Sequence, residues 1–154
     1  MSDNKTKKEI ANSCKRYASI YGSKRRIMAH QYLVELIVKR RADKQNIQLP
    51  NQWWLKKFRP TYEYWTKLWD YETKFIKRLL AKYDAECIIE AFNAFDGKNI
   101  LSAKNPNFEK IIKELQRRKD VLDATRETNV LVVKETNVLP RKPKGKQTRL
   151  SRLK

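Results

Sequence analysis

The sequence predicts an all-α protein: a compact bundle of about five helices in residues 1–122, followed by a basic, flexible tail over 123–154. Two observations predict the helices. Apolar residues recur every three or four positions, and residues that favour helix starts and ends stand between these runs. These patterns place the helices near residues 6–21, 24–44, 60–83, 85–96 and 106–122.

Start and stop signals define the first two helices. Thr6 and Glu9 have the spacing of a capping box, in which each side chain bonds the backbone N–H of the other residue. Apolar residues continue at helical spacing until Gly22 supplies a stop, and Ser23 is the expected N-cap of the second helix. The apolar face of this second helix includes a histidine and consists of Ile27, His30, Val34 and Ile37.

The remaining three helices also have clear boundaries. Asp84 is the expected N-cap of the fourth helix, and Asn105 followed by Pro106 marks the start of the fifth. The third helix carries the longest apolar stripe, formed by Trp65, Leu68, Trp69, Phe75, Ile76, Leu79, Leu80 and Tyr83. The apolar face of the fifth helix consists of Phe108, Ile111, Ile112, Leu115 and Leu122.

The tail begins after Asp123, where the helical pattern ends. The string ETNVL occurs at 127–131 and again at 135–139, and two copies are too few for a solenoid. Valine and threonine favour an extended arm or an edge strand, although a disordered linker is the preferred interpretation. From Pro140 onward seven basic residues and no acid predict a disordered cationic tail.

Charge is the strongest indication of a partner. The chain has 36 Lys and Arg against 17 Asp and Glu, a net charge of +19. Residues 60–120 are nearly balanced, with twelve basic and ten acidic groups, so most of the excess lies on either side of them. Proteins with this balance usually bind nucleic acid and less often anionic lipid, and here membrane binding ranks last because the basic segments lack an apolar opposite face.

Several other classes of protein are disfavoured. Cys14 and Cys87 are far apart and there is a single histidine, so neither a disulfide scaffold nor a Cys/His zinc site is expected. We find no signal peptide, membrane span, phosphate-binding glycine loop or catalytic triad motif, and we expect neither a cofactor nor a bound metal. An intracellular location is expected: cytoplasm or nucleoid, or the nucleus in a eukaryotic cell.

The candidate binding surface is one flank of the third helix, where cations alternate with aromatic rings. Lysine and arginine neutralise phosphates, while tyrosine offers a plate on which a base can stack. This stripe consists of Tyr64, Lys67, Tyr71, Lys74 and Arg78.

Further basic clusters complete the predicted interface. Those at helix C-termini have an alternative explanation in the helix dipole, whereas residues 24–26 lie at a predicted helix N-terminus, where the dipole disfavours cations. That cluster therefore points to an external partner. The predicted contacts in the helical region are Lys24, Arg25, Arg26, Arg40, Arg41, Arg117 and Arg118, and those in the tail are Arg141, Lys142, Lys144, Lys146, Arg149 and Arg152.

Two polar residues occupy apolar faces: His30 on the second helix and Glu72 on the third. They could form an acid–base pair in a pocket. We favour the structural interpretation, in which each is hydrogen-bonded in or near the core, to the other or to an arginine. Trp53 and Trp54 are adjacent on a short turn, so at least one of them should be partly exposed.

Together these patterns predict a non-enzymatic protein that binds DNA or RNA through its phosphates, as a subunit or accessory factor of a replication-related or RNA-related nucleoprotein assembly. One alternative is a protein–protein adaptor that uses the Trp/Tyr cluster. A second, less favoured, is a small metal-dependent nuclease that uses Glu72 with neighbouring acids.

Overall fold

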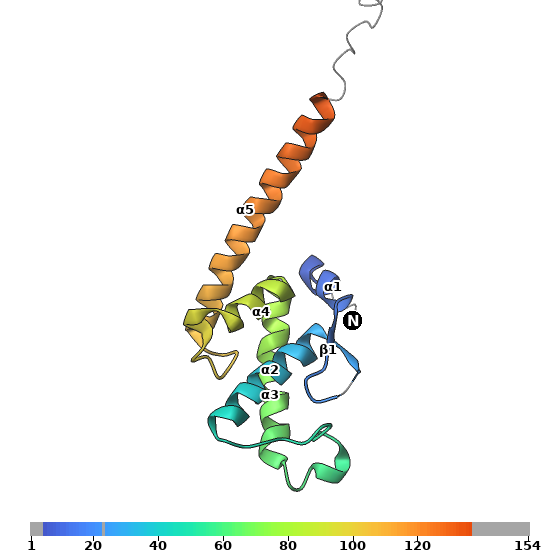
Figure 1. Cartoon of the computed structure of the whole chain (residues 1–154), viewed down its shortest axis with the longest axis vertical. Coiled ribbons are helices and arrows are strands. Elements are labelled where there is room, and N and C mark those ends of the chain that lie inside the picture. Colours follow the sequence, from blue (N-terminus) through green and yellow to red (C-terminus); the bar gives the residue numbers. More distant parts are fainter. Residues whose placement is uncertain (1–4, 23, 137–154) are drawn as a thin grey trace, which may run out of the picture. The chain divides into compact units, whose positions relative to one another are not determined.

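The computed structural model describes residues 5–22 and 24–136, with side chains up to Val130 except Phe95. These residues form five helices, two short 3-10 turns and one two-stranded hairpin (Figure 1). The chain divides into two compact units, Met1–Arg118 and Lys119–Lys154. The elements are α1 Lys7–Ser13, β1 Arg16–Ala18, β2 Arg26–Met28, α2 Ala29–Lys44, η1 Lys56–Phe58, α3 Glu63–Lys82, α4 Ala85–Asn93, η2 Phe95–Gly97 and α5 Pro106–Thr136.

The predicted all-α class is confirmed apart from the hairpin, which replaces the second half of the predicted first helix. The capping box is present: Thr6 Oγ1 accepts from the Glu9 backbone N–H at 3.1 Å, and Glu9 Oε2 accepts from Thr6 N–H at 2.9 Å. However, α1 ends at Ser13, and the antiparallel strands β1 and β2 follow with Tyr17 opposite Ile27. The predicted helix over 6–21 is therefore wrong beyond Ser13.

A buried carboxylate explains why helical spacing fails here. Glu35 on α2 accepts from Ser19 Oγ at 2.6 Å and from the backbone N–H of Ile20 at 2.7 Å. These bonds hold the hairpin connection against α2, and a helix through Ser19 would have used the Ile20 N–H for its own ladder. A tertiary contact thus overrides the local periodicity.

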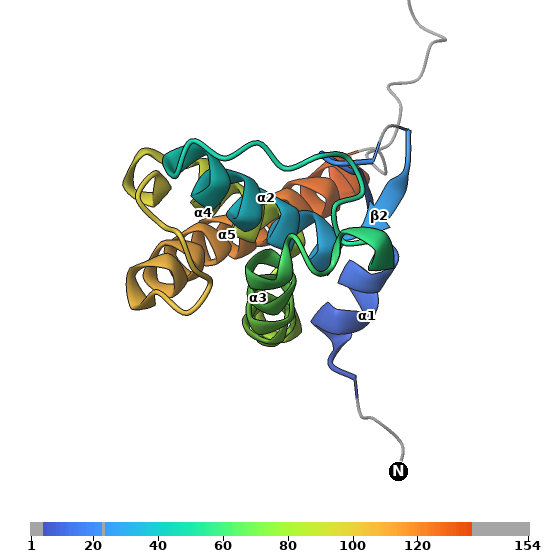
Figure 2. The same cartoon turned by 90° about the horizontal axis from the view of Figure 1, so that it is seen from below.

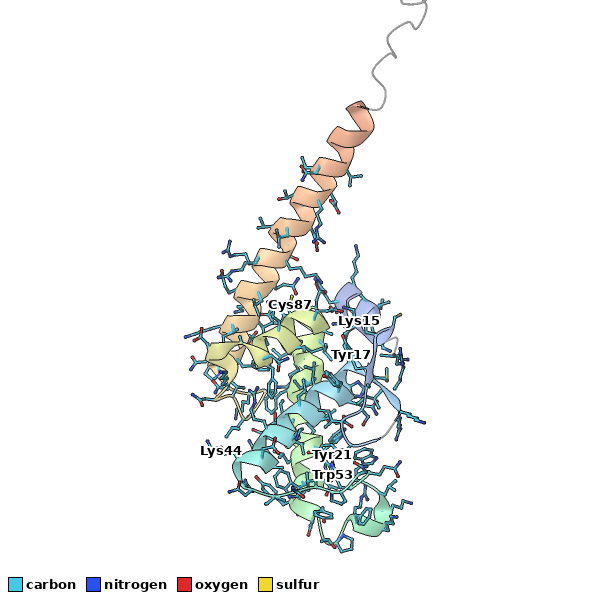
Figure 3. The ribbon with its side chains drawn as sticks, viewed as in Figure 1. Lys15, Tyr17, Tyr21, Lys44, Trp53 and Cys87 are labelled. Atoms are coloured by element: carbon cyan, nitrogen blue, oxygen red, sulfur yellow. The ribbon has the colours of Figure 1, made fainter. Side chains whose placement is uncertain are left out.

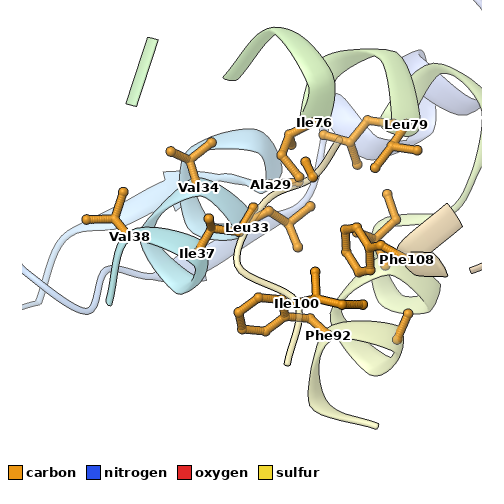
Figure 4. Close-up of a cluster of buried hydrophobic side chains, with 14 of the residues drawn as sticks. Ala29, Leu33, Val34, Ile37, Val38, Ile76, Leu79, Phe92, Ile100 and Phe108 are labelled. Atoms are coloured by element: carbon orange, nitrogen blue, oxygen red, sulfur yellow. The ribbon is translucent and has the colours of Figure 1, made fainter. Parts of the chain in front are cut away.

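The start of α2 is also displaced, from residue 24 to Ala29. The Gln31 side-chain oxygen accepts from the Met28 backbone N–H at 3.0 Å, which satisfies one free donor at the new helix start. Ser23, the predicted cap, lies outside the described residues. One face of α2 packs across α3, and both contribute to a core shared with α4 and the start of α5 (Figures 1 and 4). Figure 4 labels part of this core: Ala29, Leu33, Val34, Ile37, Val38, Ile76, Leu79, Phe92, Ile100 and Phe108.

The buried side chain of Asn12 joins the end of α3 to the beginning of α4. Its amide nitrogen donates to the carbonyls of Leu80 and Tyr83, both at 2.9 Å, and its oxygen accepts from Ala85 N–H at 3.0 Å. Asp84 occupies the predicted N-cap position, but its side chain makes no cap hydrogen bond. The α1 helix that carries Asn12 lies beside α3 (Figure 2).

Trp53 is the largest fully buried side chain, with 0% exposure, whereas Trp54 is half-buried. This confirms that the adjacent tryptophans do not share one environment. Trp53 packs edge-on against Tyr21, with ring centroids 6.3 Å apart, and Figure 3 places these two side chains together. Trp53 and Trp54, called the tryptophan segment below, are therefore packed in and against the core at one end of α3.

The last helix, α5, begins at Pro106 as predicted but continues to Thr136, so the expectation of an extended or disordered segment is wrong for residues 123–136. No proline or glycine interrupts residues 107–139, and the hydroxyls of Thr125 and Thr128 bond to carbonyls four residues earlier, at 2.9 Å each. Leu122 is 58% exposed and is not a core residue. The second ETNVL copy lies mostly outside the described residues, as does the cationic tail.

Candidate nucleic-acid interface

The outer flank of α3 presents the aromatic and basic residues of the predicted stripe. Tyr64 is 54% exposed and Tyr71 is 44% exposed, high values for aromatic side chains. Lys67, Lys74 and Arg78 are exposed as well. We call these five residues the α3 stripe. Its tyrosines are surface residues, not core residues that happen to have helical spacing.

Neighbouring groups orient both tyrosines. The ring of Tyr64 lies edge-on to Trp65 at 5.2 Å, and its hydroxyl accepts from Arg41 Nη1 at 3.4 Å. Tyr71 packs against Phe75 with ring centroids 4.9 Å apart. These contacts restrict the two rings while leaving much of their surface free, which lowers the entropic cost of stacking a ligand on them.

Two cations of the stripe, Lys67 and Arg78, contact neighbouring side chains. Lys67 pairs with Glu63 at 2.7 Å, and the hydrogen bond lowers the pKa of that carboxyl group. The pair is exposed, and such pairs contribute little, so a phosphate can displace Glu63. The Arg78 guanidinium lies over the Phe75 ring at 5.4 Å. The stripe therefore offers cations whose present contacts are weak.

Residues 24–26 lie in the hairpin and not at a helix N-terminus, because α2 begins only at Ala29. The helix-dipole argument for this cluster is therefore wrong. Lys24, Arg25 and Arg26 are nonetheless all exposed, and Lys24 adopts a left-handed backbone conformation with φ of 62°. Their exposure is therefore the remaining observation that favours contact with a partner.

Arg40 and Arg41, predicted to contact phosphates, bind backbone carbonyls of the same chain. Arg40 donates to Gly97 O at 2.6 Å, Phe92 O at 2.7 Å and Ile100 O at 3.3 Å, and its guanidinium stacks on the Phe92 ring at 3.4 Å. Arg41 donates to Leu101 O at 2.8 Å. Both side chains hold the connection between α4 and α5 in place, a structural role that the basic cluster did not reveal.

Arg117 and Arg118 are exposed and share one carboxylate. They reach Glu114 at 2.9 Å and 3.0 Å, and their hydrogen bonds lower the pKa of Glu114. They lie on α5, a different helix from the α3 stripe. The predicted tail contacts, from Arg141 to Arg152, fall outside the described residues.

Among the described residues, His30 and Glu72 form no hydrogen bond or ion pair with each other, and none is found for His30. Glu72 is fully buried; its Oε2 accepts from Ala103 N–H at 2.8 Å, and Oε1 lies 4.0 Å from Arg41 Nη2. His30 is half-buried, and burial and then the nearby Lys77 lower its pKa. Glu72 therefore connects α3 to the loop before α5, as expected for a carboxylate hydrogen-bonded in the core, but its donor is a backbone N–H and not His30 or an arginine. Within the part of the chain that the structure describes, its Oε1 accepts no hydrogen bond.

Sequence reasoning missed Glu35, the second fully buried carboxylate. Its exposed fraction is 1%, and burial raises its pKa, although its hydrogen bonds from Ser19 and Ile20 and the positive charge of Arg25 oppose that shift. The available signal was a lone acid within the apolar run YLVELIV. An acid in such a run requires hydrogen-bond partners from elsewhere in the fold.

No known protein family, curated protein or solved structure matches this chain. Within residues 5–22 and 24–136, no helix is long and apolar enough to cross a lipid bilayer. The same residues contain no group of three or more His, Cys, Asp or Glu side chains arranged to hold a metal ion. A function for this chain must therefore be inferred from its own geometry and charge.

Proposed function

We propose that this protein binds nucleic acid through its phosphates, as a subunit or accessory factor of a nucleoprotein assembly, and that the α3 stripe is part of the contact surface. The observation that carries the proposal is the exposure of Tyr64 and Tyr71 between Lys67, Lys74 and Arg78 on one helix. Positive charges at this spacing suit a phosphate backbone, and the exposed rings suit unstacked bases.

The charge of the whole chain supports this proposal. A net charge of +19 leaves the folded protein under self-repulsion that a polyanion would relieve. The stripe differs from the other cationic clusters because it combines charge with aromatic surface. By contrast, Trp53 and Trp65 are buried in the core, which leaves the adaptor alternative with only Trp54 and Trp69 of the tryptophan cluster.

The decisive measurement is affinity for a mixed-sequence oligonucleotide as a function of salt concentration. We expect the logarithm of the binding constant to fall steeply with the logarithm of salt. Replacing Lys67, Lys74 and Arg78 by alanine should make that slope shallower by about 2 to 3, because each phosphate that is no longer neutralised changes it by close to one unit.

A matched control removes three exposed cations elsewhere in the same unit, Lys44, Lys110 and Lys113. This variant has the same net charge as the stripe variant and should keep a slope closer to that of the parent protein. Equal losses in the two variants would remove the stripe from the interface, and a flat salt dependence of the parent protein would contradict nucleic-acid binding altogether.

A further inference from the structure

A hollow with a volume of about 250 Å³ lies where β2, α2, the tryptophan segment and α3 meet. Arg25, Glu35, Trp54, Arg59, Trp69 and Asp70 are among its lining residues. Its size is below the roughly 300–1,000 Å³ typical of sites for drug-sized ligands, so it suits a single flat ring. We call it the Trp54–Trp69 hollow.

One wall of the hollow is a rigid aromatic plate. Trp54 and Trp69 stack on each other with ring centroids 6.0 Å apart and planes inclined by 28°. The buried Trp53 packs edge-on against both, at 5.9 Å and 5.8 Å. Trp54 and Trp69 are themselves only half-buried. A planar ligand can therefore stack on a surface that is already held in position.

Hydrogen-bond acceptors complete the interior. Each oxygen of the buried Glu35 carboxylate accepts one hydrogen bond, from Ser19 Oγ and from Ile20 N–H. A carboxylate has about four acceptor positions, so this group can take further N–H donors. The edge of an unpaired nucleobase carries such donors beside a flat ring, the combination that this lining fits.

Two arginines stand at the same hollow. Arg25 and Arg59 are both exposed, and within the described part of the chain neither guanidinium makes a hydrogen bond or an ion pair. The lining thus contains two cations, Arg25 and Arg59, and two acids, Glu35 and Asp70. A second hollow of about 400 Å³ shares Arg59, Thr66 and Asp70 with the first and also includes Lys67 of the α3 stripe. A strand on the stripe can therefore reach the Trp54–Trp69 hollow.

We propose that the Trp54–Trp69 hollow holds one unpaired nucleobase of a bound single strand, with the flanking phosphates on Arg25 and Arg59. This inference rests on the proposed nucleic-acid binding and adds that an unpaired base of a single strand is recognised. The ring stacks on the tryptophan plate while its N–H groups donate to Glu35. Single-stranded nucleic acid is therefore bound through its bases as well as its phosphates.

The test compares an oligodeoxycytidine with a base-free sugar–phosphate strand of equal length, and follows both affinity and tryptophan fluorescence. We expect the strand with bases to bind about tenfold more tightly, the scale of one stacked base, and to quench the fluorescence. Trp54→Leu should reduce the quenching. The double variant Arg25→Ala/Arg59→Ala should also reduce the quenching. Because it changes only exposed residues, it provides the test if Trp54→Leu does not fold.

A control variant locates the effect. Lys44→Ala/Lys113→Ala removes two exposed cations outside the hollow and should leave the quenching in place. Equal affinity for both strands, or quenching that survives the Trp54 and arginine substitutions, would overturn this inference while leaving phosphate binding intact. Failure of both strands to bind would instead overturn the proposed function.

Discussion

Individual polar side chains inside this protein are each held by partners far away in the sequence. Glu35 holds the hairpin connection, Glu72 holds the Ala103 backbone, and Asn12 spans the junction between α3 and α4. A buried polar group without hydrogen bonds costs roughly 1–3 kcal/mol, so such contacts strongly restrict which arrangements of the helices are allowed.

His30 is the residue whose environment can be measured most directly, because it is the only histidine in the chain. Burial, and secondarily Lys77, lowers its pKa from 6.5. We expect nuclear magnetic resonance titration of the imidazole protons to give a midpoint below that value. Lys77→Gln should raise the midpoint only in part, since burial is the larger cause, and Lys74→Gln on the outer flank of α3 should not change it.

The same shift predicts a pH dependence of folding. Because the folded state binds this proton less readily than the unfolded state, the contribution of His30 to the free energy of unfolding is complete above pH 6.5. It is lost as the pH falls from 6.5 through the lower pKa of the folded state. A titration midpoint at or above 6.5 would show that His30 is neither desolvated nor repelled by Lys77.

At the scale of elements, the connection from α4 to α5 depends on Arg40 of α2. The Arg40 guanidinium binds carbonyls at the end of α4 and in the following loop. Gly97 permits the tight turn there, because a Cβ atom at this position would lie 2.0 Å from the carbonyl oxygen of Ala91. A single arginine, Arg40, thus holds together the end of α4, η2 and the following loop.

Arg40→Ala should lower the free energy of unfolding by about 2–4 kcal/mol, because it leaves carbonyls without their donor and removes the stack on Phe92. Chemical denaturation followed by circular dichroism measures this change. The adjacent Lys39→Ala removes only an exposed pair with Asp43 and should cost about 0.3–0.5 kcal/mol. Similar small losses in both variants would contradict the structural role of Arg40.

At the scale of the whole molecule, charge and packing are distributed differently. The core residues lie between Tyr21 and Ile112, within the unit Met1–Arg118. In the second unit, residues 120–130 are exposed at every position although they are helical. Lys119–Lys154 also carries ten basic and four acidic residues. The second unit therefore adds charge and helix, while the first contains the core.

A chain that ends at Arg118 should consequently fold without the second unit. We expect its thermal unfolding to remain cooperative, with a midpoint within about 4 °C of the full chain, the shift that about 1 kcal/mol produces in a domain of this size. Circular dichroism should lose the signal of residues 119–136. A large drop in the midpoint, or loss of cooperativity, would show that Lys119–Lys154 contributes to the stability of the first unit.

The sequence by itself determined the helical class, the capping box at Thr6, the start of α5 at Pro106 and the exposed stripe on α3. Each of these follows from residues within a few positions of one another, where spacing and capping chemistry suffice. The tertiary structure decided the hairpin, the structural use of Arg40 and Arg41, and the hollow beside Trp54 and Trp69. Those features depend on contacts between residues distant in sequence: Glu35 with Ser19 across the hairpin, and Arg40 with Gly97 across two helices. Local periodicity carries no information about such partners, because they meet only once the helices have packed.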